Sequence, residues 1–390
     1  MTLPRTDAPR PRGARRGAPE AASRNPVSGT YLNGRPMNAT TLDLVFIRHQ
    51  QNWTGAYPAS PSFSQYPHCW LRDSSFIAHA MNLHGRHASA RAFHEWVGRT
   101  LAPLAEHGRS ITDRHARGTA VDPLEMLPAR YTVDGDWIQD DGWPNFQLDG
   151  YGLWLWSFAE HLRLSGEVEL PAHLRSSVEL VIAYLNEFWL EPCSDAWEEH
   201  PNDVHTATLA CLYAGLVAIS SYASVPDGLP EAIKARVLGE HVRDGRLMKS
   251  ANDPSLDASL LLVATPCNLL APNDPVMLET TRGIRQELSR DGGLIRYRDD
   301  SYYGAGAWLL LTDLLAWHLA REGDIPAAGR AHAWVSEQRD ARGFLPEQTP
   351  VGTTDPEGIK RWTRRWGPSA NPLLWSHAMH LIAGRVLSAR

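Results

Sequence analysis

The sequence predicts an all-α fold, a closed (α/α)6 barrel in which helical hairpins form a double ring. Apolar residues recur at helical spacing along most of the chain, and no convincing series of strands interrupts them. Three pairs of helices are joined at Gly85, Gly166 or Gly323, and glycine readily adopts the left-handed conformation that ends a helix. About twelve helices are expected, enough for about six antiparallel hairpins.

The individual helices follow from apolar periodicity bounded by glycine, proline and polar residues. An open superhelix of helical repeats is the alternative all-α arrangement. No regular repeat of about 34 or 40 residues is visible, which favours the closed ring. The expected helices are 40–51, 74–84, 88–102, 151–165, 172–189, 205–221, 230–244, 255–263, 275–290, 305–322, 326–338 and 372–389.

Composition indicates one globular domain. Of the 390 residues 43% are hydrophobic, and the formal net charge is −6 with both signs interspersed, which argues against a nucleic-acid partner. The sequence contains no run of about 18 apolar residues, so no membrane-spanning helix is predicted. We expect a catalytic domain over 37–390 and a disordered tail over 1–36, rich in Pro and Arg and without the apolar segment of a secretory signal. The four cysteines lack metal-like spacing and are expected to be reduced, in a cytoplasmic protein.

Long polar segments rich in aromatic residues separate the expected helices. Most of them follow alternate helices, so a ring of hairpins would gather them on one face, where chemistry is expected. The chain has 15 tryptophans, and several lie beside Gly, Pro, Asn or Asp, a placement that suits stacking against sugar rings. The five segments are 53–73, 123–147, 191–204, 291–303 and 342–371.

Two glutamates in these segments are candidates for acid–base chemistry. Glu198 stands between Trp197 and Glu199; an apolar neighbour and a like charge would both raise its pKa and keep it protonated as an acid. The plainer interpretation is the acidic first turn of the next helix. Glu347 precedes Gln348 in the longest segment, and is either an exposed loop acid or an ionised base that activates water.

Further polar and aromatic clusters stand at helix starts. Asp73, after Trp70 and Arg72, is a candidate helix N-cap, and a carboxylate anchored in this way can also be a rigid acceptor for sugar hydroxyls. Arg296 and the segment 299–303 form either a surface turn or the entrance of a site that binds a polyhydroxyl compound such as a sugar. Trp143 begins a segment, 143–150, that could supply a stacking platform with amide and carboxylate groups, whereas 375–377 is expected in the core.

The motifs TGAYPASPSF…YPHCWLRDSS, QLDGYG, WEEH, IRYRDDSYYGAGAWLL, GFLPEQ and WSHA occur together and in this order. With them the chain resembles glycoside hydrolase family 15, the glucoamylase family, from about Thr40 to the C-terminus. The resemblance implies the (α/α)6 fold and an inverting hydrolysis with Glu198 as general acid and Glu347 as general base. It also implies a substrate-binding set: Tyr66, Trp70, Arg72, Asp73, Trp143, Trp197, Glu199, Arg296, Asp300 and Trp308.

Bacterial members of this family act on maltooligosaccharides, α-1,6-linked glucans or trehalose. Here only the expected tail precedes the barrel, so we expect a short substrate, with isomaltose or isomaltooligosaccharides favoured over maltooligosaccharides and trehalose. A sugar epimerase using a histidine pair and a non-catalytic sugar sensor are the alternatives outside this class. The histidines in or near the loops are His68, His200, His205 and His377. No cofactor is expected, no metal ligand set has convincing spacing, and the sequence leaves the oligomeric state open.

Overall fold

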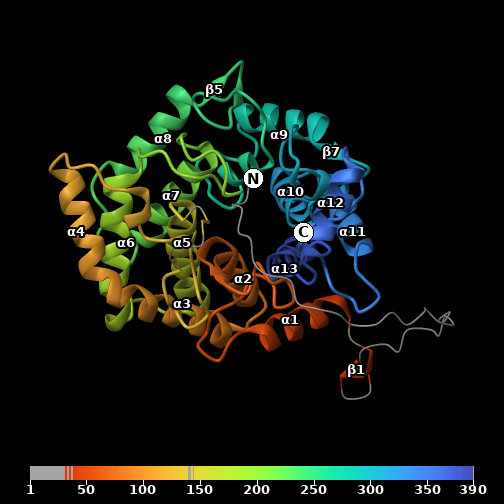
Figure 1. Cartoon of the computed structure of the whole chain (residues 1–390), viewed down its shortest axis with the longest axis horizontal. Coiled ribbons are helices and arrows are strands. Elements are labelled where there is room, and N and C mark those ends of the chain that lie inside the picture. The colour runs from red at the N-terminus through yellow and green to blue at the C-terminus, as the bar shows by residue number, and fades with distance from the viewer. Residues whose placement is uncertain (1–30, 33–34, 37, 139–141, 144, 390) are drawn as a thin grey trace, which may run out of the picture.

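The computed structural model describes residues 31–32, 35–36, 38–138, 142–143 and 145–389 of the chain. Six helical elements form an inner ring in which each contacts the next, and the last contacts the first. This closure confirms the (α/α)6 barrel and rules out an open superhelix (Figure 1). The inner elements are α2 (Leu71–Leu83), α5 (Asp149–Ser165), α7 (Thr206–Ile219), the 3-10 helix η4 (Ala258–Val263), α10 (Leu309–Glu322) and α13 (Leu374–Ser388).

Six outer helices cover the inner ring, each packed against at least one inner element. Because inner and outer elements alternate along the chain, the inner ones run in one direction and begin at the same face. The outer helices are α1 (Ala39–Gln50), α3 (His87–Leu101), α6 (Arg175–Phe188), α8 (Leu229–Glu240), α9 (Pro275–Glu287) and α11 (Ile325–Glu337).

Glycines end the inner helices where the sequence predicted hairpins. Gly85, Gly166 and Gly323 have φ of +69°, +79° and +105°, in the left-handed region. A Cβ at any of them would meet no neighbouring atom, so backbone conformation rather than space requires glycine. The three predicted hairpins are therefore confirmed.

Buried polar contacts tie the first helix to the last and complete the ring. Asp43 on α1 accepts hydrogen bonds from Arg339 at 2.8 and 2.6 Å. His377 on α13 is hydrogen-bonded to the same carboxylate at 2.7 Å. Asp43 and His377 are fully buried, and the contact joins two ends of the chain.

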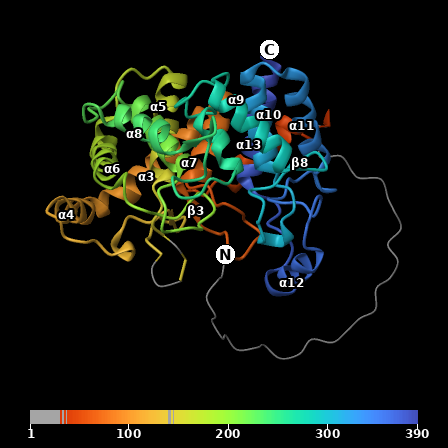
Figure 2. The same ribbon diagram turned by 90° about the horizontal axis from the view of Figure 1, so that it is seen from above.

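Several helix predictions need correction. The inner element expected over 255–263 is a 3-10 helix that begins only after its N-cap Asp257. The helix expected over 305–322 begins at Leu309, because Ala305 has φ of 58° and a short 3-10 turn, η5 (Tyr302–Gly304), precedes it. Two helices lie in segments with no predicted helix, namely α4 (Ala105–Ala116) and α12 (Pro356–Trp366). Figure 2 shows α12 outside the ring, toward the end where β3 lies.

The remaining elements are short. Three further 3-10 turns are η1 (Ala102–Leu104), η2 (Pro123–Glu125) and η3 (Ala172–Leu174). The strands pair in antiparallel twos: β1 (Tyr31–Leu32) with β2 (Arg35–Pro36), β3 (Cys69–Trp70) with β4 (Arg130–Tyr131), β5 (Val242–Arg243) with β6 (Arg246–Leu247), and β7 (Ser289–Arg290) with β8 (Gly293–Leu294).

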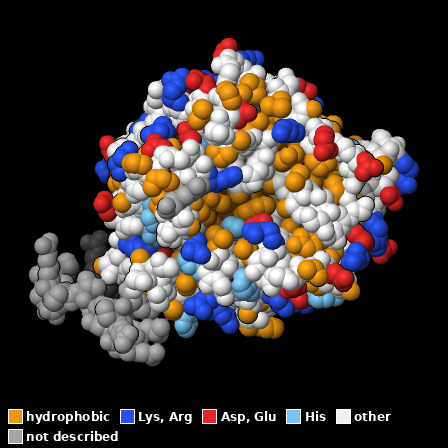
Figure 3. Space-filling model, turned by 180° about the vertical axis from the view of Figure 1, so that it is seen from behind, with side chains coloured by type: hydrophobic (Ala, Val, Ile, Leu, Met, Phe, Trp, Pro, Cys, Tyr) orange, Lys and Arg blue, Asp and Glu red, His pale blue; other side chains and the backbone are white. Residues whose placement is uncertain are grey.

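The tail expected over 1–36 lies outside the described residues except for β1 and β2. None of the described helices has the length and hydropathy needed to cross a membrane. On the face shown in Figure 3, acidic and basic side chains are interspersed, and hydrophobic side chains gather in a central hollow.

Candidate active site

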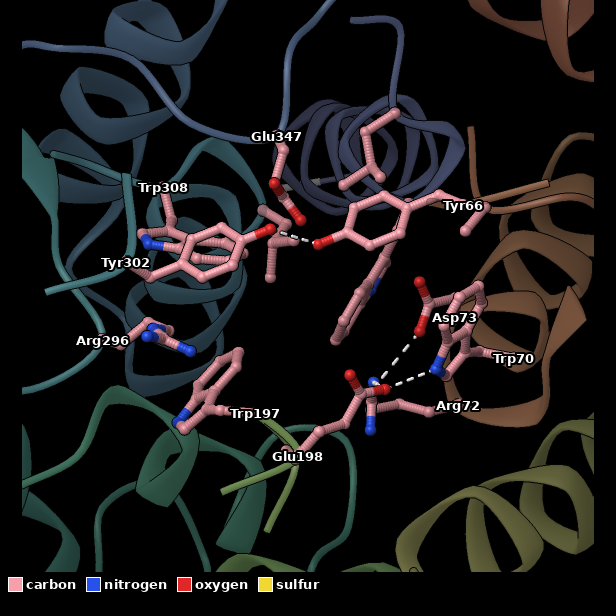
Figure 4. A pocket seen from close by; sticks show the side chains of 15 residues that line it. Tyr66, Trp70, Arg72, Asp73, Trp197, Glu198, Arg296, Tyr302, Trp308 and Glu347 are labelled. Carbon is pink, nitrogen blue, oxygen red and sulfur yellow. Dashed lines mark hydrogen bonds and ion pairs between the residues drawn. The ribbon is translucent and has the colours of Figure 1, made fainter. Parts of the chain in front are cut away.

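A pocket opens where the loops that precede the inner helices meet. Glu198 and Glu347 face each other across it (Figure 4). Most of its lining comes from the polar, aromatic-rich segments that were expected to share one face. The lining residues are Ala59, Tyr66, Trp70, Arg72, Asp73, Ala196, Trp197, Glu198, Arg296, Tyr302, Trp308, Leu310, Glu347, Leu373 and Trp375.

Glu198 is held by donors on both carboxyl oxygens. The Trp70 indole donates to Oε1, and the Trp143 indole donates to Oε2 at 2.8 Å. The Arg72 guanidinium lies 3.6 Å from Oε1. Glu198 has φ of 65°, a left-handed conformation that costs a non-glycine residue about 1–2 kcal/mol. This strained backbone directs the carboxyl group into the pocket.

Burial raises the pKa of Glu198, while Arg72, Trp70, Arg130 and Trp143 lower it. The like charge of Glu199 was expected to contribute, but it is not among the principal causes. Glu199 is instead engaged by the Tyr297 hydroxyl and by Arg296, which lies 3.4 Å away. Burial raises the pKa of Glu199, while Arg296 and the Tyr297 hydrogen bond lower it.

Glu347 is buried on the opposite side of the pocket. Its backbone is fixed by a bond from its N–H to Ala370 and by one from Leu309 N–H to its carbonyl. Burial, together with the charges of Asp73 and Glu198, raises the pKa of the Glu347 carboxyl to about 8, and Arg296 and a hydrogen bond with Tyr66 lower it. Burial thus works against the ionised state expected of a base.

Arg72 and Asp73 form one wall at the start of α2. Gln147 and Asp149 hold the Arg72 guanidinium at 2.9 and 3.3 Å. Asp73 is the third residue of α2 and not its N-cap, which is Trp70. Asp73 Oδ2 is buried and has no hydrogen-bond partner among the described residues, although it lies 3.4 Å from Arg72 Nε. Burial raises the pKa of Asp73 to about 7.

Arg296 forms the facing wall. It binds Asp300 through two bonds of 2.9 and 2.6 Å, a bidentate pair that fixes the guanidinium plane. Its Cζ lies 5.2 Å from the ring centroids of Tyr302 and Trp308. Asp299 is exposed, whereas Asp300 is buried beside Arg296.

The model of the family named Glycosyl hydrolases family 15 matches residues 44–345. This chain belongs to glycosyl hydrolase family 15. Isomaltose glucohydrolase from Kribbella flavida is 39% identical over 347 residues, covering 87% of this chain and 89% of that protein. A trehalase of Mycobacterium tuberculosis is 25% identical over 320 residues, 73% of this chain but only 42% of its own length. A solved glycosidase variant in complex with glucose superposes with a TM-score of 0.86 at 37% identity, covering 90% and 96% of the two chains.

The structure of this family 15 hydrolase brings together the residues that the sequence singled out. Trp143, Glu199 and Asp300 stand behind the lining and contact residues that form it. The other predicted residues, including both glutamates, line the pocket itself.

Three aromatic or charged residues at or beside the pocket were not predicted as part of the site. Tyr302 hydrogen-bonds to Tyr66 across the pocket, and Trp375, expected in the core, lies under Arg72 with 5.6 Å between guanidinium and ring. Arg130 stacks over the rings of Trp70 and Trp143 at 5.4 and 4.8 Å. Tyr302 lies in the segment 299–303, which was considered for sugar binding, so this motif could have been used to predict it. Arg130 had none, because only strand pairing brings it beside Trp70.

The four histidines considered for an epimerase do not line the pocket. His377 bonds to Asp43 and accepts from the Leu345 N–H at 3.1 Å. His205 bonds to the His200 carbonyl at 2.9 Å. These contacts give structural roles to histidines that an epimerase would need beside its substrate.

Among the described residues, Asp313, His332 and His380 form the single group with metal-ligand proximity. Both imidazoles bond through Nδ1 to the Asp313 carboxylate, at 2.8 and 3.1 Å. Their rings are stacked, with centroids 4.2 Å apart and planes 21° apart. A metal ion takes the in-plane lone pair of an imidazole, and rings stacked in this way do not direct two such lone pairs to one nearby point. The group is therefore a hydrogen-bonded link between α10, α11 and α13.

Proposed function

We propose that this chain is an inverting, exo-acting α-glucosidase that releases β-glucose from the non-reducing end of isomaltose and short isomaltooligosaccharides. The observation that carries the proposal is the placement of two carboxyl groups on opposite sides of one pocket, with Glu347 buried and only 9% of the Glu198 side chain exposed. Glu198 is the general acid and Glu347 the general base. The alternative substrates within the family are maltooligosaccharides and trehalose.

The reaction breaks the bond between the anomeric carbon and the glycosidic oxygen. Glu198 gives its proton to that oxygen, and Glu347 takes a proton from water as the water oxygen bonds to the anomeric carbon from the opposite face. An inverting hydrolysis of this kind needs about 6.5–9.5 Å between the two carboxyl groups, because water must fit between base and sugar. Arg296 and Tyr66 favour the ionised base that this step consumes.

The walls of the pocket suit a terminal glucose. Asp73 offers a buried oxygen without a hydrogen-bond partner and Arg72 a buried guanidinium, and both can bond to the outer hydroxyls of one sugar. Trp197, Trp308 and Trp375 provide aromatic surface for the C–H faces of the ring. Trp375 Nε1 and Trp308 Nε1 are buried without a hydrogen-bond partner among the described residues, and are further donors for hydroxyl groups.

The choice of isomaltose rests on the Kribbella flavida relative, which matches along almost its full length. Trehalose has weaker support, since the chain spans only 42% of the trehalase of Mycobacterium tuberculosis. Initial rates on isomaltose, maltose and trehalose at equal concentration test the choice. We expect the highest kcat/KM for isomaltose, and a higher value for either of the others would replace it as the substrate.

A substitution tests the base. Glu347→Ala should lower kcat by at least about 100-fold while the Kd for glucose, measured by calorimetry, changes little. Glu279→Ala, which removes an exposed carboxylate on α9, is the matched control and should turn over normally. Normal turnover by Glu347→Ala would disprove the assignment.

A further inference from the structure

A buried lysine stands behind the loop that carries Glu198. The ammonium group of Lys249 lies 3.1 Å from Asp195 Oδ2 and 3.2 Å from Asp257 Oδ2. All three side chains are buried, and none of them lines the pocket. The Lys249 ammonium also lies 4.3 Å from the centre of the Tyr297 ring. Two carboxylates held this close in a buried site repel each other unless a cation lies between them.

Asp195 shapes the loop that presents the acid. Its Oδ1 accepts the backbone N–H of Trp197 at 2.9 Å and that of Glu199 at 3.0 Å. The main chain closes the same loop, because Glu198 N–H bonds to the Asp195 carbonyl at 2.9 Å and Asp195 N–H to the Glu199 carbonyl at 2.8 Å. These bonds hold Glu198 in its left-handed conformation, with φ of 65°.

Asp257 fixes the other side of the same loop. The Trp197 indole donates to its two oxygens at 3.1 and 3.0 Å. Asp257 also caps η4, since it accepts the Ser259 N–H at 2.8 Å. Asp257 thus ties Trp197, which lines the pocket, to an inner element of the barrel. Asp195 and Asp257 both fix the loop that carries Glu198, and the Lys249 ammonium group is the cation that pairs with both of their carboxylates.

We propose that Lys249 is the positioning residue of the general acid: by bridging Asp195 and Asp257 it holds the 195–199 loop so that the Glu198 proton reaches the glycosidic oxygen. The proposal rests on the proposed role of Glu198. Lys249 touches neither substrate nor reacting atoms, so its effect must appear in the step that needs the acid. The rates of steps that do not need a proton donor should change little.

A pair of substrates separates these steps. Isomaltose needs protonation of its leaving oxygen, whereas α-glucosyl fluoride loses fluoride, a weak base that leaves without a proton. For Lys249→Met we expect kcat on isomaltose to fall by about 100-fold, within the range that general acids contribute. The rate on α-glucosyl fluoride should fall by less than about 5-fold. Lys249→Arg, which keeps the charge, should recover at least about a tenth of the lost activity on isomaltose.

Two controls and one replacement variant make the result decisive. Lys234→Met on the outer helix α8 should leave both rates unchanged. Glu198→Gln should show the same split between substrates, and equal losses on both would refute the role of Glu198 rather than that of Lys249. If Glu198→Gln shows the split and Lys249→Met loses both rates equally, or neither, the proposal for Lys249 is wrong. Should Lys249→Met fail to fold by circular dichroism, Asp195→Asn takes its place with the same expected split.

Discussion

The Trp143 indole nitrogen lies 2.8 Å from Oε2 of Glu198, in hydrogen-bonding contact with the carboxyl group assigned as general acid. Trp143 itself does not line the pocket. It therefore contacts the acid from behind the lining, where its ring packs against Trp70 and Arg130.

Removing this contact should change the pH profile in a defined direction. The Trp143 hydrogen bond favours the ionised carboxylate and so lowers the pKa of Glu198; without it the pKa rises. In Trp143→Phe the basic limb of kcat/KM against pH, which reports loss of the acid's proton, should move to higher pH, and kcat should fall about tenfold. Trp53→Phe, at a side chain that is 91% exposed, is the control. A basic limb that stays in place or moves to lower pH would contradict this account.

Asp73 should matter for binding and for the base. Its charge raises the pKa of Glu347, so Asp73→Asn should move the acidic limb of kcat/KM to lower pH. The variant should also lose about 100-fold in kcat/KM, because charged hydrogen bonds to sugar hydroxyls are worth about 1.5–3 kcal/mol each. Steady-state rates across pH measure both effects. Asp113→Asn, an exposed residue of α4, is the control, and an unmoved acidic limb would show that Asp73 and Glu347 are not coupled.

The neighbouring residues Asp299 and Asp300 provide a matched pair of variants. Asp300 is buried in a bidentate pair with Arg296, and breaking a buried pair leaves a charge unpaired. We expect Asp300→Asn to lower the free energy of unfolding by about 3 kcal/mol and to impair turnover. Asp299→Asn, at an exposed position, should stay within about 0.5 kcal/mol of the parent. Urea unfolding measures the free energy of unfolding of both variants. Equal free energies for the two would contradict the assignment of Asp300 as the buried partner of Arg296.

Buried histidines should make the fold sensitive to acid. Burial lowers the pKa of His318 to about 4, below the ordinary 6.5. Between these values the unfolded chain binds more protons than the folded one, so stability falls as pH drops below 6.5. Each such histidine contributes about 1.4 kcal/mol per pH unit. His318→Gln should reduce that slope in urea unfolding, whereas the exposed His173→Gln should not. An unchanged slope in His318→Gln would contradict the prediction.

The ring was predictable because its signals are local. Gly85, Gly166 and Gly323 mark hairpins by conformation alone, and the inner helices are apolar enough to be recognised. The helices that were missed lack this pattern: α4 buries only Gly108 and Ile111, and α12 buries none of its side chains. The start of α12 could nevertheless have been predicted, since Asp355 caps it and Pro356 follows at the first helical position.

The site was predictable where motif and position coincide, as at Glu198 and Glu347. Residues outside these motifs that act through another residue were not predictable. Lys249, Asp257 and Arg130 reach the acid loop or its aromatic neighbours only through contacts between segments distant in sequence. The pKa argument from Glu199 also failed, because the partner that neutralises it, Arg296, lies about a hundred residues away along the chain.

The anomer of the first product tests the central claim most directly. Proton NMR of isomaltose hydrolysis, recorded before mutarotation equilibrates the glucose, identifies the anomer released from the non-reducing end. With Glu198 as acid and Glu347 activating water from the opposite face, the early glucose must contain more β anomer than the equilibrated reducing-end glucose of isomaltose alone would supply. An early excess of α-glucose over that contribution would mean retention of configuration and would contradict the assignment of both glutamates.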